Sequence, residues 1–595
     1  MDLLDYYRDN LNYIRNLSAE FAAEFPKIAR RLLISDLDCQ DPYIERLLEG
    51  TAFLAARVEK KLDEGYYPFL ESVLNSVAPD ALYPVPSGAV LEAAANMDDG
   101  NVKKGAPLKA GTIFEAQVPG VNTPCRFACA EDLPLAAFTL TQAGYIHDLS
   151  SLGIKNSGAE SALHIRFSGP PGGALSLTGD IRIFLNLSEA DASLMLRLLA
   201  HDVIGVYGRA GGSGEYAALS GVGFAVPMTT GEKLFGPAFK ANTRGLRILR
   251  NFLTYPDFFK FFAVQGLASA LGNAAAPADL VIAFKRREQA LEANIKTASL
   301  KLNCVPVLNL FPKRSNRTVI DRDAYEFHLV PDRTAMGDFE VAAVRNIDFF
   351  NERNEQLFSA ANFYDESGDR GSKRRFFSLK RRKTLTRSHA RGAYAGTEAF
   401  VSFSPAGDEA SQFAADLLVT NRDLPLLLEG GAEFASSSAM APRAVFMTLP
   451  TGPDYPLVER GGRGDFARLS HIVMNLSALL WQEGEGPLEL FRAMLRSYPL
   501  RPAEEMDRMI NGIMALQSES AAFRFILGGA VFYEWGWKLR FTLDEAAYAG
   551  MGWYTFARIA GELFKSLTPV NTFLEIHFTT PQSGTIAIWK TSEIQ

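Results

Sequence analysis

The sequence predicts a multidomain α+β protein, with helical segments at the N-terminus, β-rich domains in the middle and a mixed C-terminal domain that ends in a β-hairpin. Three observations predict this class. Helical patterns fill the first 86 residues, short apolar runs alternate with turn signals from Ser87 onward, and alternating apolar residues flank a PQSG turn near the C-terminus. The chain has 595 residues, which on a prior of about 150 residues per domain corresponds to three or four domains.

The first helix is expected from about Leu3 to Phe25, because Pro26 lacks the backbone donor that a helix interior needs. Its apolar residues alternate spacings of three and four, which is typical of a heptad seam. The seam consists of Leu4, Tyr7, Leu11, Ile14, Ser18, Phe21 and Phe25, with Ser18 as its polar exception. Such a seam packs either on its own domain or in a bundle shared between subunits, and the apolar members are candidate partner-interface residues.

A second helix is predicted to begin at Asp41, a good N-cap, followed by Pro42 at the first helical position. It is strongly amphipathic and is expected to stop near Gly65. Its apolar face consists of Ile44, Leu47, Leu48, Thr51, Leu54, Ala55, Val58 and Leu62. A third helix is expected at about Pro68 to Val77, before the prolines at 79, 84 and 86.

The rest of the chain mixes strands and helices. Strands are predicted at 280–284, 304–311, 339–350 and 396–405, where apolar runs are bounded by turn signals. Helices are predicted at 187–203 with Ser188 as the cap, at 245–267 around a break at Pro256, and at 415–428, 467–481, 487–495 and 556–567. The chain is expected to end in a hairpin, in which Leu574, Ile576 and Phe578 alternate with polar residues.

Composition points to the cytoplasm. The N-terminus has no basic segment followed by an apolar run, so no signal peptide is expected. The four cysteines Cys39, Cys125, Cys129 and Cys304 are too few for a disulfide framework, and free thiols fit a reducing compartment. Charged and polar residues interrupt the most apolar stretch, 258–284, so no membrane insertion is expected.

A basic segment at 370–391 holds ten Lys or Arg residues and no acid, in a chain whose net charge is −7. Within it, we expect Lys380, Arg381, Arg382 and Lys383 to be exposed and to contribute to a partner interface. An acidic protein face is one possible ligand, and nucleic acid or anionic lipid are others. The segment could equally be a solvated loop. The acidic net charge disfavours a dedicated nucleic-acid binder, and we expect no nucleic-acid partner.

Catalytic motifs are missing from the sequence. It contains neither a phosphate-binding G-x4-GK-[ST] loop nor a G-x-S-x-G elbow. Cys125 and Cys129 are spaced like metal ligands, but only a lone His147 follows, so buried thiols explain them better. The carboxylate pairs Asp321 with Asp323 and Glu483 with Glu485, and the RGD at 463–465, are explained by turns and loops. We therefore predict no enzyme, no cofactor and no metal site.

Several motifs in order resemble the TssF family, the baseplate wedge subunit of bacterial type VI secretion systems. The N-terminal block is the most specific: EFPKIARRL at 24–32, DPYIERLLEGTAFLAARVEKKLDE at 41–64 and PVPS at 84–87. TYPDFFKFF at 254–262, NCVPVLNLF at 303–311, TNRDLP at 420–425 and VNTFLEI at 570–576 follow. The segment 366–392 and the aromatic stretch FYEWGWKLRF at 532–541 depart from the family pattern.

The resemblance implies a structural subunit of a cytoplasmic baseplate docked to the inner-membrane secretion complex. It implies that two copies of the chain join one TssG-like subunit in a wedge. Such wedges surround the spike protein, carry TssK-like trimers, meet a TssE-like sheath connector and initiate assembly of the sheath and tube. The helical segments are expected to contribute to an intersubunit bundle, and the β-rich domains to form wings.

Four domains are expected from these patterns. They are an N-terminal helical region at 1–86, a β-rich domain with helices at 87–300, a second β-rich domain with the basic segment at 301–415, and a C-terminal α+β domain at 416–595. An alternative function is a carbohydrate-active hydrolase associated with a phage-tail-like particle. A concave site lined by carboxylates with shifted pKa values would favour that alternative.

Overall fold

The computed structural model describes most of the chain. The described residues are 3–31, 41–154, 158–169, 175, 177–212, 214–235, 244–271, 276–364, 375–384, 394–404, 409–456, 470–471, 479–480, 486–498, 500–527, 530–569 and 572–590. Helix and sheet are mixed, as the sequence predicts. The chain divides into two compact units: residues 1–82 with 456–473, and residues 83–455 with 474–595.

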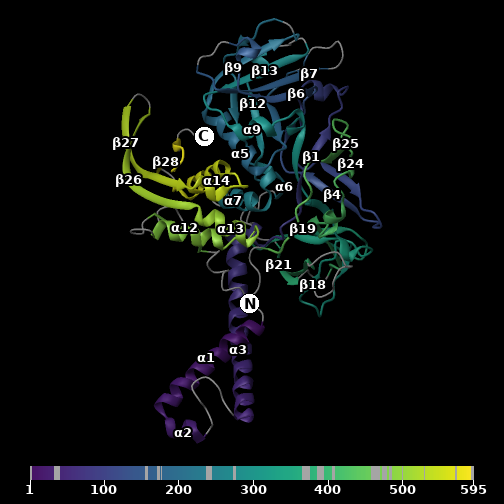
Figure 1. Ribbon diagram of the computed structural model, residues 1–595. Coiled ribbons are helices and arrows are strands. Elements are labelled where there is room, and N and C mark those ends of the chain that lie inside the picture. The colour runs from purple at the N-terminus through teal and green to yellow at the C-terminus, as the bar shows by residue number, and fades with distance from the viewer. Residues whose placement is uncertain are drawn as a thin grey trace. The chain divides into compact units, whose positions relative to one another are not determined.

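The first unit is built around a helical hairpin. Helix α1 spans Leu3–Glu24, the short α2 spans Pro26–Arg31, and α3 spans Pro42–Val77 and is followed by a 3-10 turn at Pro79–Leu82. α1 and α3 lie against one another (Figure 1). The side chain of Asp41 accepts a hydrogen bond from the backbone N–H of Tyr43, so the predicted cap is confirmed.

The break expected between two helices near Gly65 and Pro68 is wrong, because α3 continues without interruption for 36 residues. A glycine costs a helix about 1 kcal/mol relative to alanine, and a proline costs about 3 kcal/mol. Both lie inside the helix, which has run for more than five turns before Gly65 and continues for about two and a half turns after Pro68. The helical residues before and after Gly65 and Pro68 therefore stabilise the helix by more than these two residues destabilise it.

A closed barrel begins the second unit and draws its strands from distant parts of the chain. Its strands follow the order β1-β15-β4-β3-β24-β25 around the ring. They span Gly88–Ala94 (β1), Ile113–Gln117 (β3), Pro124–Cys129 (β4), Cys304–Leu308 (β15), Glu433–Ser436 (β24) and Arg443–Phe446 (β25). The pairing places Leu91 opposite both Val305 and Phe446. Inward-facing side chains such as Phe114, Phe127 and Phe434 fill the interior.

Two antiparallel sheets come from residues 139–301. One has the order β10-β9-β13-β7-β6, and the other has the order β11-β12-β8-β14. Their strands are β6 (Thr139–Ile146), β7 (Ser161–Ser168), β8 (Ile181–Leu185), β9 (Val203–Ala210), β10 (Ala217–Ala218), β11 (Gly223–Ala225), β12 (Phe261–Gln265), β13 (Ala278–Phe284) and β14 (Leu300–Lys301). The prediction of a helix through residue 267 is wrong in its second half, because Phe261–Gln265 is a strand.

An eight-stranded sheet follows. Its order is β16-β23-β19-β20-β21-β22-β18, and β17 also pairs with β23. The strands are β16 (Phe311–Arg314), β17 (Thr318–Val319), β18 (Phe327–His328), β19 (Glu340–Phe350), β20 (Gln356–Asn362), β21 (Arg375–Lys383), β22 (Thr397–Phe403) and β23 (Gln412–Thr420). The helix predicted at 415–428 is wrong, since a buried strand occupies its first part and a 3-10 turn at Leu424–Leu427 follows.

The C-terminal sheet has the order β26-β27-β28-β29. Its strands are β26 (Ile513–Leu527), β27 (Ala530–Leu543), β28 (Phe573–Thr580) and β29 (Gly584–Lys590). Strands β28 and β29 form the predicted terminal hairpin, with Leu574, Ile576 and Phe578 buried. Helices α12 (Gly486–Arg496) and α14 (Trp553–Leu567) confirm two of the predicted helices, whereas 467–481 lies mostly outside the described residues.

The remaining elements are short, apart from three helices. Those three are α5 (Glu189–His201), α7 (Arg244–Thr254) and α13 (Ala503–Asn511). The short ones are α4 (Gly100–Lys103), α6 (Glu232–Phe235), α8 (Leu267–Leu271), α9 (Gln289–Asn294), β2 (Pro107–Leu108) and β5 (Leu133–Pro134). Further 3-10 turns span Ser150–Leu152, Pro256–Phe259, Thr297–Ser299, Met336–Asp338 and Glu545–Tyr548. Ser188 caps α5, as its sequence predicts.

Candidate partner interface

The inner side of the helical hairpin is built from small and polar contacts. Ala52 and Ala56 of α3 are fully buried and allow close helix packing. The ring of Tyr7 on α1 meets Phe53 edge to face, with centroids 6.4 Å apart. Asn10 donates a hydrogen bond from Nδ2 to an oxygen of Glu59 at 2.7 Å. α1 therefore has an intramolecular partner along its middle turns.

The outer side of α3 carries a row of exposed apolar side chains. At about 100° per residue, its members fall within an arc of roughly 100°, on the side of the helix opposite Ala52 and Ala56. The row, which we call the α3 stripe, consists of Tyr43, Leu47, Leu54, Val58, Leu62 and Phe69. Leu47 is 71% exposed and Val58 is 61% exposed. An apolar row of this length is a candidate interaction surface, because soluble proteins seldom leave large contiguous apolar patches in water.

The predicted seam on α1 divides between two environments. Tyr7, Leu11 and Ile14 are half-buried, whereas Leu4 and Phe25 are exposed. Phe21 is half-buried, and its ring lies 5.3 Å from that of Phe25. The structure does not bring these six residues together in one exposed row, and their contact with a partner chain stays a prediction.

The most buried residue of α1 is Tyr6, which the heptad pattern did not select. Its neighbour one turn later is Asn10, whose Nδ2 also bonds the Tyr6 carbonyl at 2.9 Å. Because Asn10 is polar, the apolar pattern did not continue one turn after Tyr6, and the sequence did not identify this side of α1 as buried. Four members of the α3 stripe, Leu47, Leu54, Val58 and Leu62, belong to the apolar face predicted for this helix, whereas Tyr43 and Phe69 do not.

The expectation that Lys380, Arg381, Arg382 and Lys383 are all exposed is wrong for Arg381, which is only 8% exposed. The four residues end strand β21, and the inward positions Phe377, Leu379 and Arg381 alternate along it. Arg381 therefore enters the interior, where its guanidinium donates hydrogen bonds to the carbonyl oxygens of Val341 and Ala342. The sequence prediction considered only the basic composition of this segment and missed that alternate residues of a strand face the interior.

The other basic residues of β21 have partners within the chain. Lys380 and Arg382 both pair with Glu326, and Arg382 also lies 4.3 Å from the centroid of the Phe400 ring. Burial opposes ionisation of Glu326, but the hydrogen bonds from these two cations lower its pKa. Lys383 lies over the ring of Tyr455 at 4.9 Å. These contacts replace the solvated-loop interpretation for 375–383, while 370–374 and 385–391 lie outside the described residues.

A buried ionic group lies in the sheet that contains β13. Asp279 is directly opposite Arg166 on β7 and Arg209 on β9, and both guanidinium groups bond its carboxylate at 2.6 Å. His164 lies 3.1 Å from the same carboxylate. Burial by itself would raise the pKa of Asp279, but the hydrogen bonds from Arg166, Arg209 and His164 lower it to about 2. A carboxylate held ionised by two arginines serves packing rather than proton transfer.

The two spaced cysteines lie inside the barrel. Cys125 and Cys129 both face inward from β4 and belong to its apolar core. Burial raises the pKa of the Cys125 thiol, and it raises that of Cys129 to about 12. No group of three or more metal-binding side chains occurs among the described residues. The two thiols act as small apolar core residues.

The first of the two carboxylate pairs noted in the sequence forms a local turn. Asp321 accepts a hydrogen bond from the backbone N–H of Asp323, which is the turn expected for that pair. Glu483, Glu485 and the tripeptide at 463–465 lie outside the described residues, as does Cys39.

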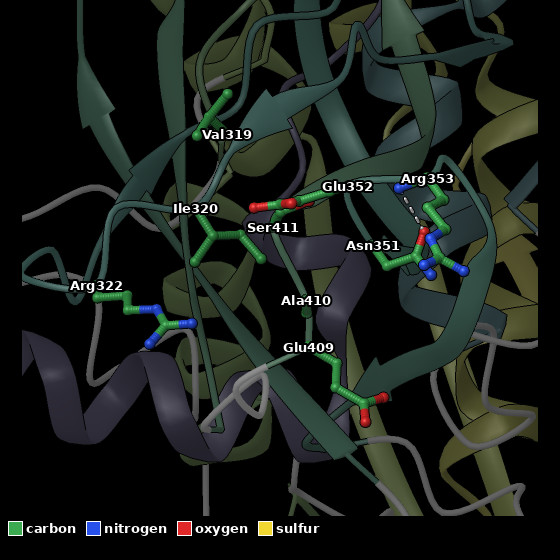
Figure 2. Close-up of a pocket in the computed structure, with 9 residues that line it drawn as sticks. All are labelled: Val319, Ile320, Arg322, Asn351, Glu352, Arg353, Glu409, Ala410 and Ser411. Atoms are coloured by element: carbon green, nitrogen blue, oxygen red, sulfur yellow. Dashed lines mark hydrogen bonds between the residues drawn. The ribbon is translucent and has the colours of Figure 1, made fainter.

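One large pocket of about 830 Å³ lies at an end of the eight-stranded sheet. Figure 2 shows its lining, which comes from the segment after β17, the turn between β19 and β20, and the residues before β23. Two carboxylates, Glu352 and Glu409, alternate around it with Arg322 and Arg353. This open hollow is lined by a mixture of opposite charges, which is ordinary for a protein surface.

Comparison with known proteins decides the family. The family described as "Type VI secretion system, TssF" matches residues 1–593. The chain belongs to the TssF family. A curated member, the "Type VI secretion system component TssF1" of Pseudomonas aeruginosa (strain PAO1), is 28% identical over 610 residues. That alignment covers 99% of this chain and 98% of the relative.

Two solved structures share the TssF fold. A chain of the "type VI secretion system TssK-TssF-TssG baseplate subcomplex" superposes with a TM-score of 0.69 at 21% identity, covering 92% of this chain and 98% of that chain. A chain of "the baseplate complex from the type VI secretion system" gives a TM-score of 0.53 at 18% identity, covering 99% and 98%. Among the described residues of this TssF chain, no helix is long and apolar enough to cross a membrane.

Proposed function

We propose that this TssF chain is a structural, non-enzymatic subunit of a type VI secretion baseplate. Family membership over nearly the whole chain supports this proposal. The names of the solved relatives, a TssK-TssF-TssG baseplate subcomplex and a baseplate complex, indicate the assembly to which it belongs. The proposed partners are a TssG-like subunit, with two copies of this chain per TssG, together with TssK-like trimers, a TssE-like sheath connector and the spike protein.

The α3 stripe is the observation that carries the assembly role. A helix that leaves Leu47, Leu54, Val58 and Leu62 in water is stabilised when another apolar helix covers them. We propose that the α1–α3 hairpin enters a helical bundle formed with the TssG-like subunit and the second copy of this chain. Wedges of this kind would surround the spike and initiate sheath and tube assembly, in the cytoplasm beside the inner-membrane complex.

Co-expression tests this function directly. The chain is expected to copurify with the TssG-like subunit of the same system in a ratio of two to one. A chain that remains a stable monomer and ignores the TssG-like subunit would contradict the proposal.

A further inference from the structure

The C-terminal sheet sends out a two-stranded arm. Strands β26 and β27 pair along their whole length, from Ile513 with Leu543 to Leu527 with Ala530. Strand β28 pairs with β27 only from Gly536 to Thr542. In the part of the chain that the structure describes, no third strand pairs with the ribbon beyond Gly536, and Figure 1 shows β26 and β27 running on past β28. We call residues 520–527 and 530–535 of this ribbon the arm.

One face of the ribbon is covered by helices at its base. Leu539 and Phe541 of β27 are buried on that face. The ring of Phe541 packs against Phe491 of α12 and Phe564 of α14, with centroids 5.9 and 5.7 Å apart. Helices of this chain thus cover the first half of the face. Because side chains alternate along a strand, the same face continues outward through Trp537, Trp535 and Tyr533.

On the arm this face is aromatic and exposed. Tyr533 and Trp535 are each 71% exposed. Across the ribbon, Trp535 is opposite Ala522 and Trp537 is opposite Ser520. Two of these rings therefore stand beside small residues of β26, and Tyr533 stands opposite Arg524. We call this side of the arm, which carries Tyr533 and Trp535, the aromatic face. Trp and Tyr are the residue types that most often dominate binding energy at protein interfaces.

We propose that the aromatic face of the arm binds an amphipathic helix of another subunit. Neighbouring strands lie about 4.8 Å apart, so a two-stranded ribbon matches the width of one helix of about 10 Å diameter. The base of the same face is already covered by helices, and a helix from outside continues that packing. Strand addition would use the ribbon's edge and would leave the rings exposed.

Charge adds a requirement on the partner. Arg524 lies opposite Tyr533 on the aromatic face and is exposed. The described residues of this face on the arm, Ser520, Ala522, Arg524, Val531, Tyr533 and Trp535, include no acid. The incoming helix should therefore present apolar residues to Tyr533 and Trp535 and an Asp or Glu to Arg524.

The opposite face of the ribbon is a natural control. Glu534 lies there, across from Phe523, and nearer the base Glu519 pairs across the ribbon with Lys538. The ring of Phe523 stacks on Phe573, with centroids 5.8 Å apart, so part of this face is already in use. The two faces of one ribbon thus differ in chemistry, which allows a face-specific test.

Photo-crosslinking in the assembled complex tests the proposal. p-Benzoylphenylalanine is incorporated in place of Trp535 or, as the control, in place of Glu534, in full-length chain co-expressed with the TssG-like and TssK-like subunits. Crosslinked peptides are identified by mass spectrometry. We expect crosslinks from 535 to a helical segment of another subunit, at a yield on the order of tenfold above those from 534.

A double variant, Tyr533→Ser with Trp535→Ser, gives a second readout. It should lower the affinity of the arm's partner on the order of tenfold or more. Ile588→Ser, at another exposed apolar position on β29 of the same sheet, should leave the affinity unchanged. Both variants should melt like the parent chain, because exposed substitutions shift stability by less than about 0.5 kcal/mol.

Each other outcome overturns the proposal. Crosslinks from 535 to a second copy of the arm, to a strand or to lipid would identify a different occupant. No crosslink at all would mean that nothing binds the aromatic face. The inference rests on the proposed baseplate function but fails separately from it. A chain that copurifies with the TssG-like subunit but gives no crosslink from 535 refutes the arm's role alone.

Discussion

Arg381 Nη1 donates a hydrogen bond to the carbonyl oxygen of Val341, although Arg381 belongs to the most basic segment of the chain. The bond joins β21 to β19, two strands that are not neighbours in their sheet. A cation that looks like surface charge in the sequence therefore stabilises the interior of the second unit. Arg381 is therefore buried, whereas the basic residues on either side of it, Lys380 and Arg382, are exposed.

Replacing Arg381 should destabilise the fold, whereas replacing Lys380 should not. Arg381→Ser leaves the buried carbonyl oxygens of Val341 and Ala342 without their donor, which costs about 1–3 kcal/mol. Lys380 is half exposed, and Lys380→Ser should change stability by less than about 0.5 kcal/mol. Thermal melting followed by circular dichroism compares the two variants. Equal and small shifts would show that Arg381 is not packed in solution.

The α3 stripe predicts a variant that folds but does not assemble. Leu54→Glu with Val58→Glu places two charges on an exposed face, so the isolated chain should keep its melting temperature within a few degrees. In a helical bundle the same carboxylates would be buried without partners, at a cost of several kcal/mol. Copurification with the TssG-like subunit should be lost.

A matched control tests whether the effect depends on the position of the new charge and not only on adding a charge to an exposed apolar residue. Val319→Glu changes another exposed apolar residue in the second unit and should leave copurification intact. If the stripe variant still copurifies, the stripe is not the bundle surface. If it unfolds by itself, the stripe is covered within the chain.

Local signals predicted the helix starts, because a cap is a contact between neighbours in sequence. Asp41 before Pro42 and Ser188 before Glu189 both begin helices as expected. The final hairpin was also predicted, since its strands are joined by one short turn. Strand 412–420 was missed because its apolar residues are continuous, and continuous burial does not distinguish a strand from a helix.

The barrel could not be predicted from local patterns. Its closure pairs Leu91 with Phe446, more than 350 residues away along the chain, and no periodicity reports such a partner. The four expected domain ranges stay a prediction, although the barrel draws strands from three of them. For the interface, the sequence showed which helix was amphipathic. It did not show that Ala52 and Ala56, rather than Leu54 and Val58, would lie on the buried side.

The buried cysteines should be unreactive in the folded chain. Cys125, Cys129 and Cys304 are buried, and burial raises the pKa of each thiol, so little thiolate is present at neutral pH. In a Cys39→Ser background, Ellman's reagent should label these three thiols only after addition of denaturant. Fast labelling of the native chain would show that the barrel opens readily or that its core is accessible.

Asp279 predicts a specific acid sensitivity of the second unit. Its pKa is about 2 in the folded chain and 3.8 as a reference value, so the unfolded chain binds the proton more readily. The carboxylate therefore contributes stability above about pH 4, and that contribution is lost as the pH falls from about 4 to 2. The shift corresponds to about 2 kcal/mol at neutral pH.

The pH dependence of a variant isolates this contribution. Asp279→Asn removes the titrating group and leaves Arg166 and Arg209 without their shared anion, so it should be less stable than the parent at pH 7. As the pH falls from about 4 to 2, the parent loses the stability that its ionised carboxylate contributes, so the difference in stability between parent and variant should narrow, and part of this narrowing should already be measurable at pH 3. Asp416→Asn breaks a more exposed pair with Arg314 and should give a small gap at both pH values. A gap for Asp279→Asn that stays constant from pH 7 to pH 3 would mean that the carboxylate's charge does not stabilise the sheet.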